Sequence, residues 1–123
     1  MDLYLQFLGA DDSNVLNRTG KNAELPHFLN AVEAYNGVEV AAANCLTCHA
    51  ENLNGELVIG LGNNSFDYTQ NRGAENTLLA NALTLAYGAD APERLAYEPF
   101  RRATAVLSDQ LMTATQGVNP AGK

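Results

Sequence analysis

The stretch Cys45-Leu46-Thr47-Cys48-His49 decides how this chain of 123 residues is interpreted. It places two thiols three residues apart and an imidazole directly after the second thiol. The whole chain contains only two cysteines and two histidines, and chance would produce this arrangement roughly 3 times in 10,000. Such a rare arrangement indicates a functional site rather than an accident of composition.

The spacing C-x-x-C-H is the signature of c-type haem attachment. Two intervening residues on a helical turn give the sulfurs the separation at which they add across the two vinyl groups of the porphyrin. The adjacent imidazole then faces one side of the ring and ligates its iron. The motif predicts one covalently attached haem c, held by Cys45 and Cys48, with His49 as the proximal iron ligand.

Two other kinds of site use cysteines at this spacing. A surface disulfide or a thioredoxin-like dithiol is the first, and the redox dithiol would follow a strand and precede a helix. The stretch before Cys45 instead has a helical pattern. A zinc site is the second, and it would need His27 or an acidic residue as its fourth ligand, because the motif provides only three. Both fit the sequence less well than haem attachment.

The composition indicates one small acidic domain. The formal net charge is -7 and the isoelectric point is near 4.5. This charge argues against nucleic acid and anionic membranes as partners. It suits a redox protein with a basic docking face, and the alternative is that the acidic residues serve solubility alone.

The apolar segments predict no membrane span, because none approaches the roughly 18 apolar residues that a crossing needs. The N-terminus lacks the basic region of a signal peptide. Since c-type haem is attached outside the cytoplasm, we expect a periplasmic or other extracytoplasmic location. A signal or anchor would have been removed, or the chain would be an excised domain.

The apolar spacing predicts helices and no strand. The expected helices begin at Pro26, cover Val38–His49 and Ala74–Tyr87, begin again at Pro92, and run from Pro99 to about Thr115.

The largest irregular stretch is expected from Asn52 to Gly73, which is rich in glycine and asparagine. Its first part, to Phe66, is expected to wrap the haem, because glycine lets the backbone approach a flat ligand.

The segment from Gly37 to Gly117 resembles the class I cytochrome c fold. Gly37 lies eight residues before the first cysteine of the motif, where these cytochromes often place a helix-opening glycine. Met112 lies 63 residues after His49, close to the interval between the proximal histidine and the distal methionine of that fold. In place of the family's Gly-Pro pair, this chain has Ile59-Gly60-Leu61-Gly62.

The resemblance implies an all-α fold, with cytochrome c-like helices packed around one covalently attached haem and an extra N-terminal segment. It divides the chain into an extension with one helix (1–36), a haem domain (37–117) and a tail or linker (118–123). The chain also resembles a module of bacterial dihaem or fused cytochromes, in which the tail Asn119-Pro120-Ala121 would run toward a second domain.

The resemblance implies a one-electron carrier rather than an enzyme, with Met112 as the sixth ligand of the iron. A thioether ligand stabilises ferrous iron and raises the potential. His27 in that position would give a bis-histidine iron at lower potential, and an open position is the third alternative.

Other functions stay open at this point. One is a haem enzyme or gas sensor with an open or His27-ligated distal side, and another is the electron-entry domain of a larger redox enzyme. Residues able to pair with the haem propionates share a positive charge or a hydrogen-bond donor: Arg72, Arg101, Arg102, Tyr68, Asn63 and Asn64.

Overall fold

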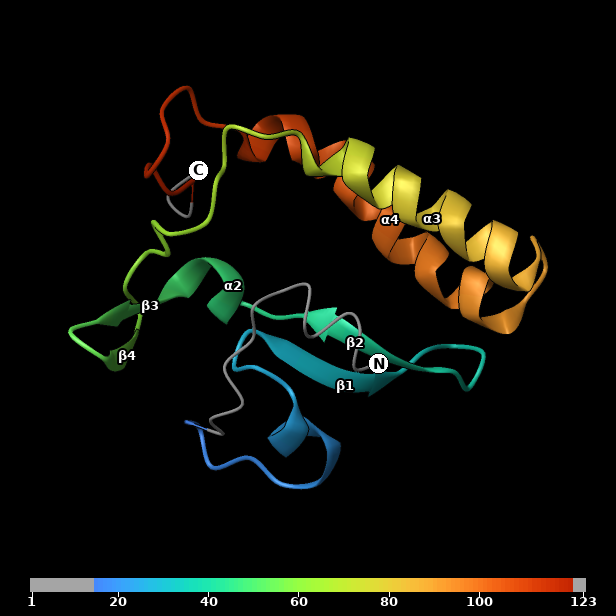
Figure 1. Ribbon diagram of the computed structural model, residues 1–123, viewed down its shortest axis with the longest axis horizontal. Coiled ribbons are helices and arrows are strands. Elements are labelled where there is room, and N and C mark those ends of the chain that lie inside the picture. The colour runs from blue at the N-terminus through green and yellow to red at the C-terminus, as the bar shows by residue number, and fades with distance from the viewer. Residues whose placement is uncertain (1–14, 121–123) are drawn as a thin grey trace. The chain divides into compact units, whose positions relative to one another are not determined.

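The computed structural model describes residues 15–120. The first 14 residues of the expected N-terminal extension and the last three of the expected tail lie outside the described residues. Residues 15–120 contain three α-helices, one 3-10 helix and two two-stranded antiparallel sheets (Figure 1). The expected all-α fold is therefore wrong, because two stretches of the chain form β-hairpins. The chain divides into two compact units, residues 15–32 with 41–63 and residues 33–40 with 64–120.

The first hairpin replaces the helix expected from Pro26 and the first part of the helix expected over Val38–His49, of which only Leu46–His49 is helical. It consists of β1 (Leu29–Glu33) and β2 (Glu39–Ala43). The turn between them contains Asn36-Gly37, a pair typical of hairpin turns. Gly37 has φ of +81°, which glycine adopts without strain, and its N–H donates a hydrogen bond of 2.9 Å to the Ala34 carbonyl. The chain therefore reverses at this point instead of continuing as a helix.

The second hairpin lies in the stretch that was expected to be irregular. β3 (Ala50–Leu53) pairs antiparallel with β4 (Glu56–Ile59). The two turn residues, Asn54 and Gly55, have φ of +53° and +88°. A positive φ at both central residues is the requirement of a type I′ turn, which matches the twist of the flanking strands.

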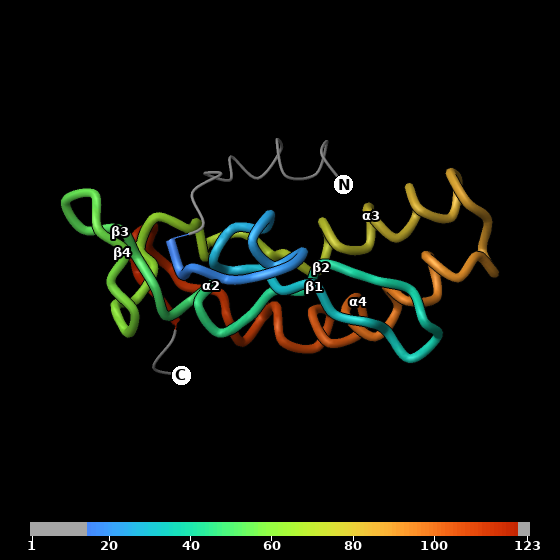
Figure 2. Tube along the Cα trace, turned by 90° about the horizontal axis from the view of Figure 1, so that it is seen from below, coloured from blue at the N-terminus to red at the C-terminus, as the bar shows by residue number. Residues whose placement is uncertain are grey.

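The second unit contains α3 (Arg72–Tyr87) and α4 (Pro92–Leu111), which pack against each other as an antiparallel pair (Figure 2). The helix expected to end at Tyr87 is confirmed as α3. As expected, Gly88 is its C-cap: the glycine has φ of +100° and donates a hydrogen bond of 2.9 Å to the Thr84 carbonyl.

The helix α4 joins two helices that were expected to be separate. It begins with Pro92, where the missing N–H of proline costs nothing. Pro99 lies inside it and has no N–H to donate to the Leu95 carbonyl. The helix nevertheless continues to Leu111, because packing along a neighbouring helix outweighs the loss of one backbone hydrogen bond.

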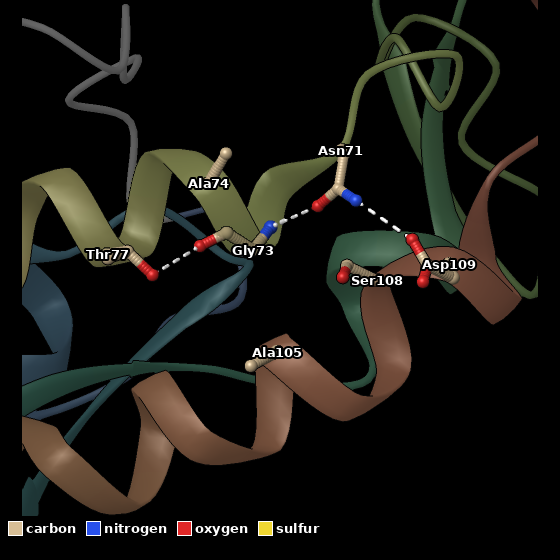
Figure 3. Close-up of a pocket in the computed structure, with 7 residues that line it drawn as sticks. All are labelled: Asn71, Gly73, Ala74, Thr77, Ala105, Ser108 and Asp109. Carbon is tan, nitrogen blue, oxygen red and sulfur yellow. Dashed lines mark hydrogen bonds between the residues drawn. The ribbon is translucent and has the colours of Figure 1, made fainter.

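A close contact joins the beginning of α3 to the end of α4 (Figure 3). The Asn71 side chain accepts a hydrogen bond from the Gly73 N–H (2.9 Å) and donates one to Asp109 (2.9 Å). A Cβ atom on Gly73 would lie only 2.8 Å from the Ser108 hydroxyl oxygen. A shallow pocket lies beside this contact and is lined by Asn71, Gly73, Ala74, Thr77, Ala105, Ser108 and Asp109.

The cores of the described units are small. Their buried apolar residues are Leu25, Leu29 and Ala50 in the first unit and Tyr68, Ala80 and Ala96 in the second. On α3 and α4, by contrast, Leu78, Leu85 and Val106 are 71%, 89% and 70% exposed. Since burial of apolar area is the main stabilising contribution to folding, these cores contribute modestly to stability.

Candidate functional site

The C-x-x-C-H motif forms a single helical turn between the two hairpins (Figure 1). Cys45 is the N-cap residue of α2 (Leu46–His49), and its carbonyl accepts hydrogen bonds from the N–H groups of Cys48 (3.3 Å) and His49 (3.0 Å). Cys45 is exposed and Cys48 is half-buried, and both sulfurs are thiols rather than halves of a disulfide. His49 is exposed at the end of the turn. One short element thus presents two thiols and an imidazole.

The strand β2 precedes this turn, so the helical pattern read before Cys45 is wrong. That pattern was the argument against a thioredoxin-like redox pair. A low-pKa redox cysteine instead depends on a helix N-terminus or a neighbouring positive charge. The helix α2 has only four residues and is followed directly by β3. Its weak dipole is a poor basis for redox-active thiols.

Asn44 anchors the start of the turn. Its side-chain oxygen accepts a hydrogen bond from the Leu46 N–H (2.8 Å), which satisfies a helix-start donor that has no partner inside the helix. Its side-chain nitrogen donates to the His27 carbonyl (2.9 Å) and to the Asn30 side chain (3.1 Å). Its backbone N–H donates to the Phe28 carbonyl (3.0 Å). A single residue therefore connects the turn to the segment 27–30.

Asn63 anchors the end of the turn. Its backbone N–H donates to the Cys48 carbonyl (3.0 Å), and its side chain donates to the Thr47 carbonyl (3.0 Å). The Gly60 N–H donates to the His49 carbonyl (2.7 Å). Carbonyls at a helix end have no partner within the helix, and here the segment 60–63 supplies partners for three of them.

His27 belongs to the same unit as the motif. Its ring is half-buried and lies edge-on to the Phe28 ring, with 5.2 Å between the centroids. Burial lowers the pKa of His27 below its usual value, the positive charge of Arg18 lowers it further, and Glu51 opposes the shift. Arg18 is held nearby by hydrogen bonds to the carbonyls of Leu25, Pro26 and Leu29. The neutral form of His27 is therefore favoured, and a neutral imidazole is the form that binds iron.

Met112 belongs to the second unit. The expected helix to Thr115 ends earlier, at Leu111, and Met112 has extended backbone with φ of -68° and ψ of +141°. Its side chain is half-buried. Met112 therefore lies in the non-helical segment after α4.

The expected propionate partners are engaged within the protein. Arg101 and Arg102 both contact Glu98, at 2.6 Å and 2.8 Å. Hydrogen bonds from Arg101, Arg102 and Arg94 hold the pKa of Glu98 far below its usual range. Arg72 pairs with Glu75 at 2.7 Å.

The aromatic and amide candidates also have partners. The buried hydroxyl of Tyr68 accepts a hydrogen bond from Asn119, and the Asn63 amide contacts Thr47 as described above. Pairing of these residues with haem propionates stays a prediction.

The side chains of the motif are of the types that a c-type haem requires. Within residues 15–120, no group of three or more His, Cys, Asp or Glu side chains is arranged to hold a metal ion. A haem iron needs no such group, because the porphyrin supplies four nitrogens and the protein supplies only axial ligands. Two accessible thiols and one exposed imidazole on a single turn are the donors that this group requires.

Comparison with known proteins assigns no family to the chain. No family model, no curated protein and no solved structure matches it. In the part of the chain that the structure describes, no helix combines the length and apolar composition needed to cross a membrane.

Sequence reasoning did not predict that two asparagines hold the turn: Asn44 was not considered, and Asn63 was named only as a candidate propionate partner. Asn44 directly precedes the first cysteine, and asparagine side chains often hydrogen-bond to the backbone two residues further on, so its position alone was a usable signal. The role of Asn63 depends on a contact with Thr47, 16 residues away, which no local pattern reveals.

Proposed function

We propose that this protein is a one-electron carrier that holds a single haem c. The observation that carries the proposal is the C-x-x-C-H motif, which occupies one helical turn with two thiols and an exposed imidazole. The group bound there supplies a ferric/ferrous couple, which exchanges one electron and forms no bond to a substrate.

The residues of the turn have separate roles in this proposal. The thiols of Cys45 and Cys48 each add across one vinyl double bond, so that sulfur bonds to one carbon and the thiol hydrogen goes to the other. No oxidant is needed for this addition. The imidazole of His49, next to Cys48, would ligate the iron of the bound group.

For the sixth ligand we propose Met112, as the resemblance implies. Its position in a non-helical segment supports this choice, because the distal methionine of class I cytochromes usually lies in a loop. A carrier benefits from two strong axial ligands, which limit rearrangement between the two redox states. His27 is the competing ligand, because its neutral form is favoured.

The test is covalent attachment. The full chain would be expressed in a bacterial periplasm together with a c-type attachment system. We expect the colour to remain with the polypeptide after denaturation and acid-acetone extraction. Cys45→Ala and Cys48→Ala should each reduce the yield of coloured protein sharply, whereas Asn81→Ala, an exposed substitution in α3, should not. Haem that extracts cleanly from the wild type would refute the proposal.

A further inference from the structure

The attachment turn is too short to be stable by itself. The helix α2 has four residues and lies between β2 and β3. Isolated helices shorter than about 12–15 residues are marginal in water even with favourable sequences. Contacts from outside the turn must therefore hold it in helical form.

Several of those contacts come from two asparagines, Asn44 and Asn63. Asn44 accepts from the Leu46 N–H and donates to the His27 carbonyl and to Asn30. Asn63 donates from its side chain and its backbone to the carbonyls of Thr47 and Cys48. The first residue satisfies the start of the turn and the second satisfies its end.

A third contact supports the same turn from its middle. The Thr47 hydroxyl donates to the Phe28 carbonyl (3.2 Å), which also accepts from the Asn44 N–H. The two variable positions of C-x-x-C-H, Leu46 and Thr47, are thus both linked by hydrogen bonds to residues outside the motif.

We infer that Asn44 and Asn63 are positioning residues, which hold the two thiols and the imidazole of the motif in the geometry that attachment needs. That the turn holds a haem rests on the proposed function. The positioning role of the two asparagines rests only on contacts within the chain. The Asn44 side chain fixes the turn at the Leu46 N–H, and the Asn63 side chain fixes it at the Thr47 carbonyl. Loss of either side chain should loosen the turn without unfolding α3, which lies in the other unit.

The experiment measures amide hydrogen exchange in the full chain as purified from the periplasmic expression described above. Asn44→Ala should accelerate exchange of the Leu46 N–H about 5–10-fold, the expected effect of losing one hydrogen bond. Asn44→Asp keeps the acceptor for that N–H but loses the donor to the His27 carbonyl and to Asn30, so it should restore only part of the protection. Asn81→Ala is the matched control, and the amides of α3 are the internal reference.

Attachment provides a second measurement. Asn44→Ala and Asn63→Ala should both increase the fraction of protein with one thioether bond instead of two, which the pyridine haemochrome spectrum distinguishes. The fraction of protein with one thioether bond depends on the geometry of the thiols and not on electron transfer. Asn44→Asp should again lie between Asn44→Ala and the wild type.

The outcomes separate the two proposals. If Asn44→Ala exchanges like Asn81→Ala at the Leu46 N–H, or if it exposes the amides of α3 equally, the local positioning role is refuted. If the wild type carries no covalent haem but Asn44→Ala loosens the turn, the proposed function fails and the positioning role stands.

Discussion

The backbone of Gly73 lies so close to Ser108 that a Cβ atom at position 73 would be 2.8 Å from the serine oxygen and 3.3 Å from its Cβ. Ser108 is buried, with 8% of its surface exposed, so it has little room to move aside. The approach of α3 to α4 thus depends on the absence of a side chain at one position.

We expect Gly73→Val to destabilise the protein by about 1–3 kcal/mol, the usual cost of overpacking a tight contact. Ala74→Val is the matched control, because Ala74 is the next residue and is exposed. Helix propensity alone would favour valine over glycine and disfavour valine over alanine. Urea denaturation would measure the free energy of unfolding of both variants. A Gly73→Val protein as stable as Ala74→Val would contradict the steric interpretation.

The sixth ligand is tested by two substitutions. If Met112 ligates the iron, the ferric protein should be low-spin with the weak near-red band of a sulfur–iron bond, and Met112→Ala should abolish that band. Carbon monoxide should then bind the ferrous form readily, because the position is open.

The competing ligand predicts the opposite pattern. If His27→Ala makes the iron high-spin while Met112→Ala leaves the spectrum unchanged, the iron is bis-histidine. Ready binding of carbon monoxide to the wild type would instead indicate an open distal side and favour a gas-sensing or catalytic role.

The depressed pKa of His27 predicts a dependence of stability on pH. Its usual value is 6.5, and burial together with Arg18 lowers it in the folded state. The unfolded chain therefore binds more protons just below pH 6.5, and the free energy of unfolding should fall as the pH is lowered through that region.

His27→Gln isolates this contribution, because glutamine does not titrate. Denaturation at a series of pH values from 7.5 to about 5.5 would give the difference in the free energy of unfolding between wild type and variant. A difference that does not change over this range would contradict the shift. Glu51 and Arg18 are unchanged in both proteins, so their own effects cancel in the comparison.

The net charge of -7 predicts electrostatic association with a basic redox partner. The rate of electron exchange with such a partner should fall as ionic strength rises toward 0.1 M, where charges about 10 Å apart are largely screened. Stopped-flow reduction across a salt series would measure it, with a small neutral reductant as the control. A flat response with both reagents would remove electrostatic docking from the proposed function.

Local signals predicted one helix well and misassigned two hairpins. The helix expected over Ala74–Tyr87 matches α3 (Arg72–Tyr87) closely. Its end was predictable because the C-cap glycine, Gly88, directly follows Tyr87. The hairpins were missed although Asn36-Gly37 and Asn54-Gly55 are both strong turn signals. Their strands are only four or five residues long, too short for a two-residue period to stand out against a helical one.

The interior of α4 also shows the limit of local signals. Pro99 was expected to begin a helix, because proline suits a first turn and breaks a helix interior. In the structure it lies within α4. Contact with α3 decides this outcome, and that contact is absent from any local pattern.

The sequence by itself determined which groups the candidate site contains, because Cys45, Cys48 and His49 lie close together in the chain and their spacing alone places them on one turn. Only the tertiary structure decided what holds that turn. The hydrogen bonds of Asn44 and Asn63 reach 14–17 residues along the chain. Such contacts form only when the chain folds back on itself, so they depend on the hairpins and cannot be read from neighbouring residues.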